Sequence, residues 1–212
     1  MRNNVILGVA AMAAIVVASN ILVQFLVGDW LTWGAFVYPF AFLVTDVMNR
    51  VFGAADARRV VAAGFVVGIA CSLAGAMIEI DGSALVTFRI ALASGTAFLA
   101  AQLLDVAIFD RLRRQAWWRA PLVSSFAGSV VDTFLFFGIA FSAQLSFLEP
   151  GGGAEWAGEI VPLFGTGIAA PLWVGLAIAD FCVKFSIALV ALAPFKVVSG
   201  RLMRANSAVR QY

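Results

Sequence analysis

The stretch YPFAFLVTDVMNRVFG, residues 38–53, places an aspartate, Asp46, inside an otherwise apolar and aromatic run. One helical turn later the chain adds Asn49 and Arg50. A charged side chain at the centre of a membrane-spanning helix costs roughly 2.5–3.5 kcal/mol on insertion scales, so it needs a partner, a water-filled cavity or a function. We therefore interpret the rest of the chain as a scaffold around Asp46 and a few polar groups like it.

The composition is that of an integral membrane protein. Of the 212 residues, 63% are hydrophobic and 12% are charged, and the mean hydropathy is +0.99. Soluble domains carry about 25% charged residues, so this chain has too few charges to cover a surface that faces water. Histidine, the commonest metal ligand and the usual proton shuttle near neutral pH, is absent from the sequence. We expect no metal site and no cofactor.

Successive apolar runs predict an all-α integral membrane protein with about six transmembrane helices in a single transmembrane domain, residues 1–212. A hydrocarbon core of about 30 Å is crossed by about 20 residues of helix. The run 160–195 would be ~54 Å long as one helix, and Pro and Gly residues break its first part, so 162–170 is expected to be interfacial or re-entrant. The predicted spans are 5–27, 31–52, 60–78, 86–109, 121–145 and 171–195.

The basic residues predict the orientation. Under this scheme all fourteen Lys and Arg residues except Arg89 and Lys184 fall on one side of the membrane. Cytoplasmic loops are enriched in Lys and Arg, so both termini are predicted to be cytoplasmic. The basic 111–119 loop, with Trp117 and Trp118, fits a juxtamembrane loop better than a nucleic-acid site. The opposite loops are acidic and carry Asp29, Glu79, Asp81, Glu149, Glu155 and Glu159.

Small residues recur every fourth position in the third span, at Gly64, Gly68, Ser72 and Ala76. Such a stripe lets two helices approach closely. The partner helix is either within the same chain or in a second copy, so a homodimer is possible.

Polar side chains inside the spans recur three or four residues apart, which places the members of each pair on one helix face. Simpler interpretations remain open for two of the groups. Asp180 and Lys184 could only neutralise each other, and Asp46 and Asp105 could lie near the interface, where Arg50 and Arg111 reach them. The pairs are Asp46 with Asn49, Gln102 with Asp105, and Asp180 with Lys184.

Asp132 needs a different account. It lies ~18 Å along the helix from Pro121, near mid-bilayer, with no cation within a helical turn. It shares a face with Ser125 and Ser129. Asp132 must therefore find a partner on another helix, stay protonated or line a wet cavity.

Together these groups predict a polar pocket with apolar and aromatic walls. Carboxylates and a glutamine suit a flat ligand with adjacent N–H donors and a carbonyl, such as the edge of guanine, but cation or proton conduction fits the same residues. The sequence contains no GxxxxGK[ST], HExxH or GxSxG motif, so it carries no enzymatic signature.

Three stretches carry a family resemblance: YPFAFLVTDVMNRVFG, TAFLAAQLLDVAIFDRLRR at 96–114 and SSFAGSVVDTFLFFGIAF at 124–141. With the small-residue third span and the tryptophan pair, they resemble the YhhQ-type queuosine precursor transporters, also called the vitamin uptake transporter family, over about residues 5–195. The resemblance implies a multi-pass carrier of the bacterial inner membrane, similar in fold to energy-coupling-factor substrate-binding subunits. Its implied substrates are 7-cyano-7-deazaguanine and 7-aminomethyl-7-deazaguanine, the bases used to make queuosine in tRNA.

The resemblance also predicts which residues act. The expected gate or proton path contains Asp46 and Asn49. Two other interpretations stay open: a substrate-binding subunit of an ATP-driven transporter, which would need an ATPase partner, and a membrane-embedded enzyme or assembly factor. The expected substrate-binding residues are Gln102, Asp105, Ser125, Asp132, Asp180 and Lys184.

Overall fold

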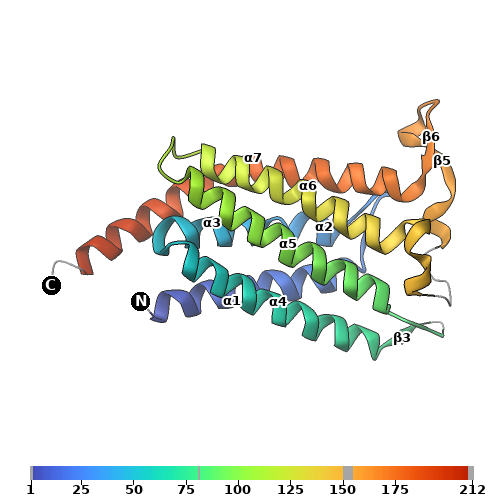
Figure 1. Cartoon of the computed structure of the whole chain (residues 1–212), viewed down its shortest axis with the longest axis horizontal. Coiled ribbons are helices and arrows are strands. Elements are labelled where there is room, and N and C mark those ends of the chain that lie inside the picture. The colour runs from blue at the N-terminus through green and yellow to red at the C-terminus, as the bar shows by residue number, and fades with distance from the viewer. Residues whose placement is uncertain (1, 81, 150–154, 210–212) are drawn as a thin grey trace.

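Six helical segments of the computed structural model are long and apolar enough to cross a membrane, which confirms the predicted all-α transmembrane fold. The structure describes residues 2–80, 82–149 and 155–209. The helices run side by side along the long axis of the molecule (Figure 1). They are α1 (Arg2–Leu22), α2 (Trp33–Val37), α3 (Phe40–Phe52), α4 (Ala54–Ala76), α5 (Phe88–Leu112), α6 (Arg119–Phe141) and α7 (Leu172–Val209).

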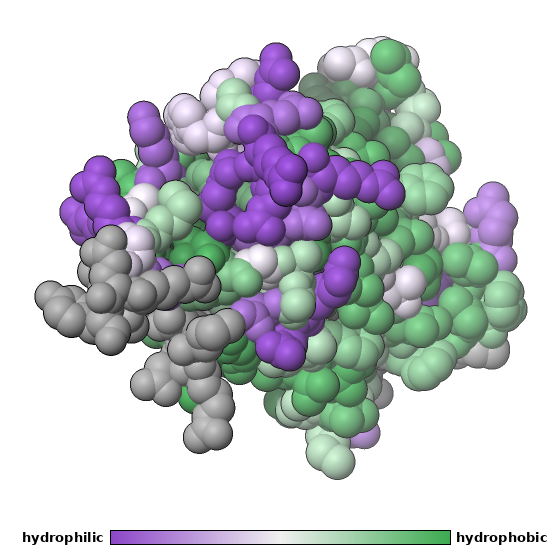
Figure 2. Space-filling model, turned by 60° about the vertical axis from the view of Figure 1, so that its left-hand side comes forward, coloured by the Kyte–Doolittle hydropathy of each residue, from purple (hydrophilic) through white to green (hydrophobic). Residues whose placement is uncertain are grey.

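Both termini lie at the same end of the bundle, together with the α3–α4 and α5–α6 connections (Figure 1). Figure 2 shows hydrophilic residues gathered at this end and largely hydrophobic flanks. Since these connections carry the basic residues, this end is the cytoplasmic one, as the charge pattern predicts. Asp81 and Arg210, which belong to the same charge pattern, lie outside the described residues.

Short antiparallel hairpins connect the helices at the opposite end. They pair β1 (Leu26–Val27) with β2 (Leu31–Thr32), β3 (Glu79–Ile80) with β4 (Ser83–Ala84), and β5 (Ile160–Pro162) with β6 (Ala169–Pro171). Three 3₁₀ turns, η1 (Ala143–Leu148), η2 (Glu155–Gly158) and η3 (Leu163–Gly165), complete this end. The β5–β6 hairpin stands at the end of the bundle and not between the helices, so segment 162–170 is not re-entrant (Figure 1).

Helix bounds differ from the expected spans at several places. The first helix ends at Leu22, because the chain turns into the β1–β2 hairpin around Gly28, whose φ is 62°. The last helix continues past residue 195 to Val209 and contains Pro194. In Figure 1 its final turns extend beyond the other helices.

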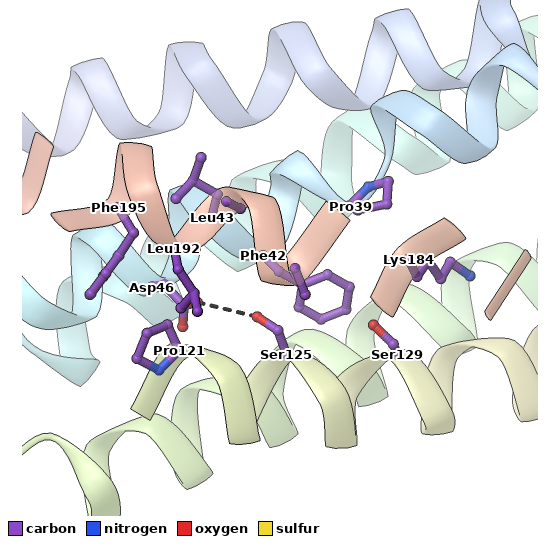
Figure 3. A pocket seen from close by; sticks show the side chains of 12 residues that line it. Pro39, Phe42, Leu43, Asp46, Pro121, Ser125, Ser129, Lys184, Leu192 and Phe195 are labelled. Atoms are coloured by element: carbon purple, nitrogen blue, oxygen red, sulfur yellow. Dashed lines mark hydrogen bonds between the residues drawn. The ribbon is translucent and has the colours of Figure 1, made fainter. Parts of the chain in front are cut away.

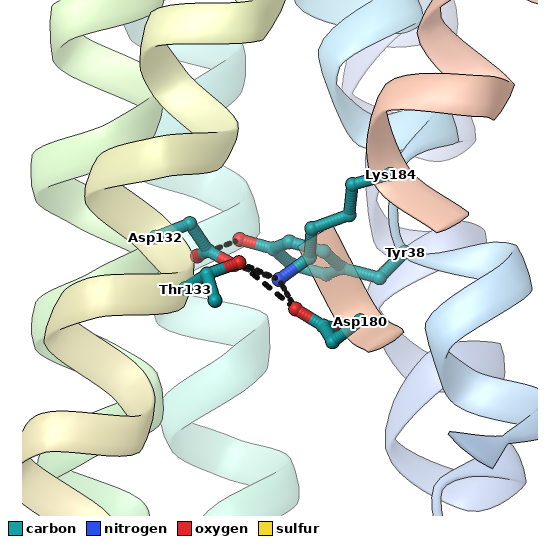
Figure 4. Close-up of polar contacts among 5 residues, drawn as sticks. All are labelled: Tyr38, Asp132, Thr133, Asp180 and Lys184. Carbon is teal, nitrogen blue, oxygen red and sulfur yellow. Dashed lines mark hydrogen bonds and ion pairs between the residues drawn. The ribbon is translucent and has the colours of Figure 1, made fainter. Parts of the chain in front are cut away.

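The second span consists of two helices, α2 and α3, that meet at Pro39. Proline has no backbone N–H and fits the first position of a helix, so it stops α2 and starts α3. The residue before it, Tyr38, turns its side chain into the bundle (Figure 4). At the other end of α3, Gly53 has a φ of 97°, which lets the chain reverse into α4.

The small-residue stripe of α4 packs within the chain at its first two positions. A Cβ atom on Gly64 would lie 2.6 Å from Met12 Cγ and 3.0 Å from Phe98 Cζ, and one on Gly68 would lie 3.7 Å from Val16 Cγ1. These contacts bring α1 and α5 against α4. The homodimer stays a prediction.

The third helix, α3, lies in the middle of the packing and contacts α1, α4, α5, α6 and α7. Apolar clusters surround it on both sides. The first joins α1, α3, α4 and α5 around Met12 and Phe98, and the second joins α3, α5, α6 and α7 around Phe109 and Phe195. This central position gives the polar residues of α3 neighbours on several helices.

Candidate functional site

A lysine cluster joins the α2–α3 junction, α6 and α7 in the core of the bundle (Figure 4). Lys184 Nζ donates to Asp132 Oδ2 at 2.6 Å and to Thr133 Oγ1 at 3.3 Å, and it also forms an ion pair with Asp180. The Tyr38 hydroxyl donates to the other Asp132 oxygen at 2.8 Å. The Thr133 hydroxyl lies 2.9 Å from Asp180 Oδ2, to which it donates.

Asp132 thus has the cross-helix partner that its isolation on α6 required. Asp180 and Lys184 also pair with each other, as their spacing predicts, but Lys184 does more than neutralise its own helix. One ammonium group serves two carboxylates, so the cluster carries a formal charge of −1 when all three groups are ionised. Each charged group has a direct partner, and the cluster ties α7 to α6 and to Tyr38.

A carboxyl cluster lies among α3, α5 and α6, nearer the cytoplasmic ends of these helices. Asp46 accepts hydrogen bonds from Ser124 and Ser125, each at 3.2 Å, one at each carboxylate oxygen. Asp105 on α5 lies near Asp46, because hydrogen bonds on either side, from Thr45 to Gln102 and from Asn49 to Val106, hold these two stretches of α3 and α5 together. Asp46 is 2% exposed and Asp105 is fully buried.

Two further α3–α5 contacts flank the carboxyl groups. The Thr45 hydroxyl donates to Gln102 Oε1 at 2.7 Å, and Asn49 Nδ2 donates to the backbone carbonyl of Val106 at 3.0 Å. These bonds explain the polar i,i+3 pairs of the two helices. Each pair faces the other helix, and α3 and α5 are joined through them.

The carboxyl cluster is incompletely hydrogen-bonded. Both oxygens of Asp105, Asn49 Oδ1 and Gln102 Nε2 are buried and have no hydrogen-bond partner among the residues that the structure describes. Buried polar groups in folded proteins are nearly always paired, so each exception requires an explanation. Here the unpaired atoms belong to neighbouring turns of α3 and α5, and the three acceptor oxygens outnumber the one amide donor.

A small cavity lies between the two clusters (Figure 3). Its polar wall consists of Asp46, Ser125, Ser129 and Lys184, and the ring of Phe42 forms part of the apolar wall. The volume is about 10 Å³. That is room for about one water molecule, whereas small-molecule pockets measure about 300–1,000 Å³. The structure therefore shows a closed conformation, and a ligand enters only if the helices around the cavity separate.

The cytoplasmic side of this cavity is closed by aromatic and basic residues. Phe195, which lines the cavity, packs edge-on against Phe109 with the ring centroids 6.0 Å apart. The Arg50 guanidinium lies 5.4 Å from the Phe109 centroid and 5.9 Å from that of Phe195. It also donates to the backbone carbonyls of Arg113 and Trp117. This arrangement joins α3, α7 and the α5–α6 connection at the cytoplasmic end.

The sequence left open whether Arg50 and Arg111 at the interface reach Asp46 and Asp105, and the contacts of Arg50 test this interpretation. Arg50 makes its hydrogen bonds to backbone carbonyls, and no arginine within the described ranges is hydrogen-bonded to Asp46 or Asp105. Both carboxyl groups are buried, and Arg50 uses its hydrogen bonds on backbone carbonyls instead.

The predicted site residues therefore divide into three groups. Ser125 and Lys184 line the cavity, together with Asp46 from the predicted gate or proton path. Asp132 and Asp180 hold Lys184, while Gln102, Asp105 and Asn49 lie in the carboxyl cluster. The two clusters meet only through the cavity that they border.

Sequence reasoning missed several polar members of both clusters. Thr45 and Ser124 adjoin predicted positions and complete the carboxyl cluster, and Thr133 does the same in the lysine cluster. Their side chains are short and common in apolar helices, so they carry little signal. Tyr38 was missed because its partner is 94 positions away in the sequence.

Comparisons with known proteins agree on one family. The family described as "putative vitamin uptake transporter" matches residues 32–198. The chain is 36% identical over 194 residues to the queuosine precursor transporter of Escherichia coli (strain K12), an alignment that covers 85% of this chain and 79% of that protein.

Two further relatives are named probable queuosine precursor transporters. That of Haemophilus influenzae is 43% identical over 124 residues, which is 52% of each protein. That of Bacillus subtilis (strain 168) is 28% identical over 179 residues, covering 76% of this chain and 68% of the relative. No solved structure matches the chain.

Proposed function

The chain belongs to the vitamin uptake transporter family, and on that premise we propose that it imports the queuosine precursors 7-cyano-7-deazaguanine and 7-aminomethyl-7-deazaguanine. The coarser statement is established: the protein is a multi-pass transporter of the bacterial inner membrane, with a small-molecule substrate and no enzymatic role. The names of the relatives support a queuosine precursor as the substrate, and the choice of these two bases rests on the family resemblance and on the chemistry of the cavity.

The closed cavity between the two clusters is the observation that carries the proposal. It offers an acceptor, Asp46, and a hydroxyl donor, Ser129, beside the aromatic ring of Phe42. Lys184 and Ser125 also line it, but their N–H and O–H groups already donate to protein acceptors. A deazaguanine presents adjacent N–H groups to a carboxylate and a carbonyl oxygen to a cationic or hydroxyl donor. Its flat ring can stack on an aromatic side chain.

Roles follow from these positions. Asp46 accepts hydrogen bonds from the N–H edge of the base, and Ser129 donates to its carbonyl. Ser125, which already donates to Asp46, orients that carboxylate. Asp132 and Asp180 hold Lys184 in place, while Gln102 and Asp105 support the α3 face from behind.

Opening of the cavity is part of the proposed cycle, because about 10 Å³ cannot hold a base. The α7 wall consists of small residues, Ala188 and Ala191, next to Leu192. Helix α7 meets α6 through the lysine cluster and α5 through the Phe109–Phe195 contact. If the Phe109–Phe195 contact broke while the lysine cluster stayed intact, the cavity would open toward the cytoplasm.

The test is uptake of labelled 7-deazaguanine precursors into proteoliposomes that contain only this protein. Ser125→Ala removes a hydrogen bond worth about 0.5–1.5 kcal/mol, so KM should rise about 2–12-fold. Ser186→Ala, at an exposed hydroxyl of α7 that bonds only its own helix, is the matched control and should leave KM unchanged.

Each outcome bears on a different part of the proposal. Binding of the labelled base without transport would favour a subunit that needs an ATPase partner. Absence of binding by the folded wild-type protein would refute the deazaguanine assignment. Equal KM values for Ser125→Ala and the wild type would remove Ser125 from the site.

A further inference from the structure

The unpaired carboxyl group of Asp105 is the most unusual feature of the core. It is fully buried on α5, and neither of its oxygens has a hydrogen-bond donor within the described part of the chain. Its neighbour Asp46 has donors for both oxygens, but these are neutral serine hydroxyls. Two carboxyl groups therefore lie side by side in the membrane core without a cation in direct contact.

The lysine cluster shows how the same protein handles buried carboxylates elsewhere. There, Lys184 contacts both Asp132 and Asp180, and hydroxyl groups complete their hydrogen bonds. If Asp46 and Asp105 were both ionised, two like charges would face each other at low dielectric, an arrangement that proteins resolve by letting such a pair hold one proton. A proton between them replaces this repulsion with a hydrogen bond and gives one Asp105 oxygen a partner.

Few other charged groups surround the pair. On α3 the nearest is Arg50, which is bonded to backbone carbonyls. At the end of α5, Arg113 pairs with Asp110 and donates to the backbone carbonyls of Asn49 and Arg50, and on α7 Lys184 borders the same cavity as Asp46. From α6 only the Ser124 and Ser125 hydroxyls face the pair. Asp56 and Arg59 of α4 pair with each other, and the described spanning part of α1, residues 5–22, carries no charged residue.

We propose that Asp46 and Asp105 form the proton-binding site of a proton–substrate symporter. This inference rests on the proposed function and adds its energy source. The Asp105 carboxyl group holds the proton and donates it to an Asp46 oxygen, so Asp46 remains a carboxylate that can accept from the substrate. One proton enters from the periplasmic side with each substrate molecule, and the same proton leaves to the cytoplasm.

Proton binding and substrate binding are coupled because Asp46 borders the cavity on one side and contacts the protonated Asp105 on the other. With Asp105 protonated, Asp46 is held by three donors and presents a fixed acceptor to the cavity. When Asp105 loses its proton to the cytoplasm, the two carboxylates repel each other and the acceptor is displaced. Proton release and substrate release are therefore linked on the same side of the membrane, next to the Arg50 contacts.

The experiment compares net accumulation with exchange in proteoliposomes. Wild-type protein should accumulate labelled 7-deazaguanine precursor when the interior is alkaline, and should exchange it for unlabelled precursor without a gradient. Asp105→Asn is neutral and nearly isosteric, and its amide can donate to Asp46. Whatever its effect on exchange, this variant should lose gradient-driven accumulation at least 10-fold more than it loses exchange.

Asp110→Asn is the matched control, because Asp110 is on the same helix, is partly exposed and pairs with Arg113 at the cytoplasmic end. It should accumulate substrate like the wild type. Gradient-driven accumulation by Asp105→Asn, or equal loss of exchange and accumulation in a folded variant, would overturn the proposal.

A second measurement uses only the wild-type protein, so it tests the proposal even if the Asp105→Asn variant does not fold. Addition of precursor to lightly buffered vesicles that contain wild-type protein should make the external medium more alkaline, by one proton for each substrate taken up. Uptake with no alkalinisation, or uptake that follows a sodium gradient instead, contradicts the proton site. Absence of exchange by the wild type contradicts the proposed substrate itself, so the two failures can be told apart.

Discussion

Replacement of Lys184 by methionine is expected to destabilise the bundle more than any other single change in the lysine cluster. The side chains of Lys184, Asp132 and Asp180 are 5%, 6% and 13% exposed, so water screens none of them well. Methionine has a similar length but no charge. Lys184→Met therefore leaves two buried carboxylates without a cation, while their Tyr38 and Thr133 hydrogen bonds remain.

The expected loss of unfolding free energy follows from these two uncompensated carboxylates. Removal of one partner from a buried ion pair costs about 3–5 kcal/mol, because the other charge stays buried without compensation. The double variant Lys184→Met with Asp132→Asn removes one of the two orphaned charges, so it should recover about 1–3 kcal/mol relative to Lys184→Met alone. We expect the pair of substitutions to be non-additive, as contacting residues are.

The assay is denaturation of the purified protein in detergent, followed by the loss of helical circular dichroism. Lys196→Met is the matched control, because Lys196 on the same helix lies 4.8 Å from the Trp117 ring and makes a cation–π contact worth about 0.5–1 kcal/mol at exposed sites. A loss below about 1 kcal/mol for Lys184→Met, or full additivity with Asp132→Asn, would refute the view that one ammonium group stabilises both carboxylates.

Two further substitutions test the walls of the cavity. A Cβ atom on Gly128 would lie 2.6 Å from Phe42 Cε1, so Gly128→Ala should push this ring into the cavity and raise the KM for uptake about 10-fold, an overpacking effect of about 1–3 kcal/mol. Gly138→Ala, on the same helix with no atom within 4 Å, should leave KM unchanged, and equal KM values for the two variants would argue against the effect. Tyr38→Phe removes the 2.8 Å hydrogen bond to Asp132 and should lower the unfolding free energy by about 1.5–3 kcal/mol, as bonds to charged groups do. An unchanged denaturation curve for Tyr38→Phe would show that another group satisfies this carboxylate.

Some properties of this protein follow from the sequence alone. The low share of charged residues requires a membrane environment, and the side on which the basic residues fall sets the orientation. The spacing within a helix also places Asp46 with Asn49, Gln102 with Asp105 and Asp180 with Lys184 on common faces. These conclusions depend on composition and on the period of one helix, both of which are readable from a single chain.

Other properties depend on which helix faces meet. The spacing shows that Asp180 and Lys184 can pair, but only the packing of α6 against α7 brings Asp132 to the same ammonium group. The spacing likewise leaves Asp105 free to contact a base, and in the structure Asp105 is not among the residues that line the small cavity.

The physical reason lies in what the helical period leaves open. A period of 3.6 residues determines where a side chain points on its own helix, but not how that helix is rotated against its neighbours. That rotation is set by close packing, such as Gly64 against Met12, and by breaks such as Pro39, which turns Tyr38 inward. The sequence by itself therefore determined the membrane fold and its orientation, and only the tertiary structure divided the polar residues into a satisfied lysine cluster and an unsatisfied carboxyl cluster.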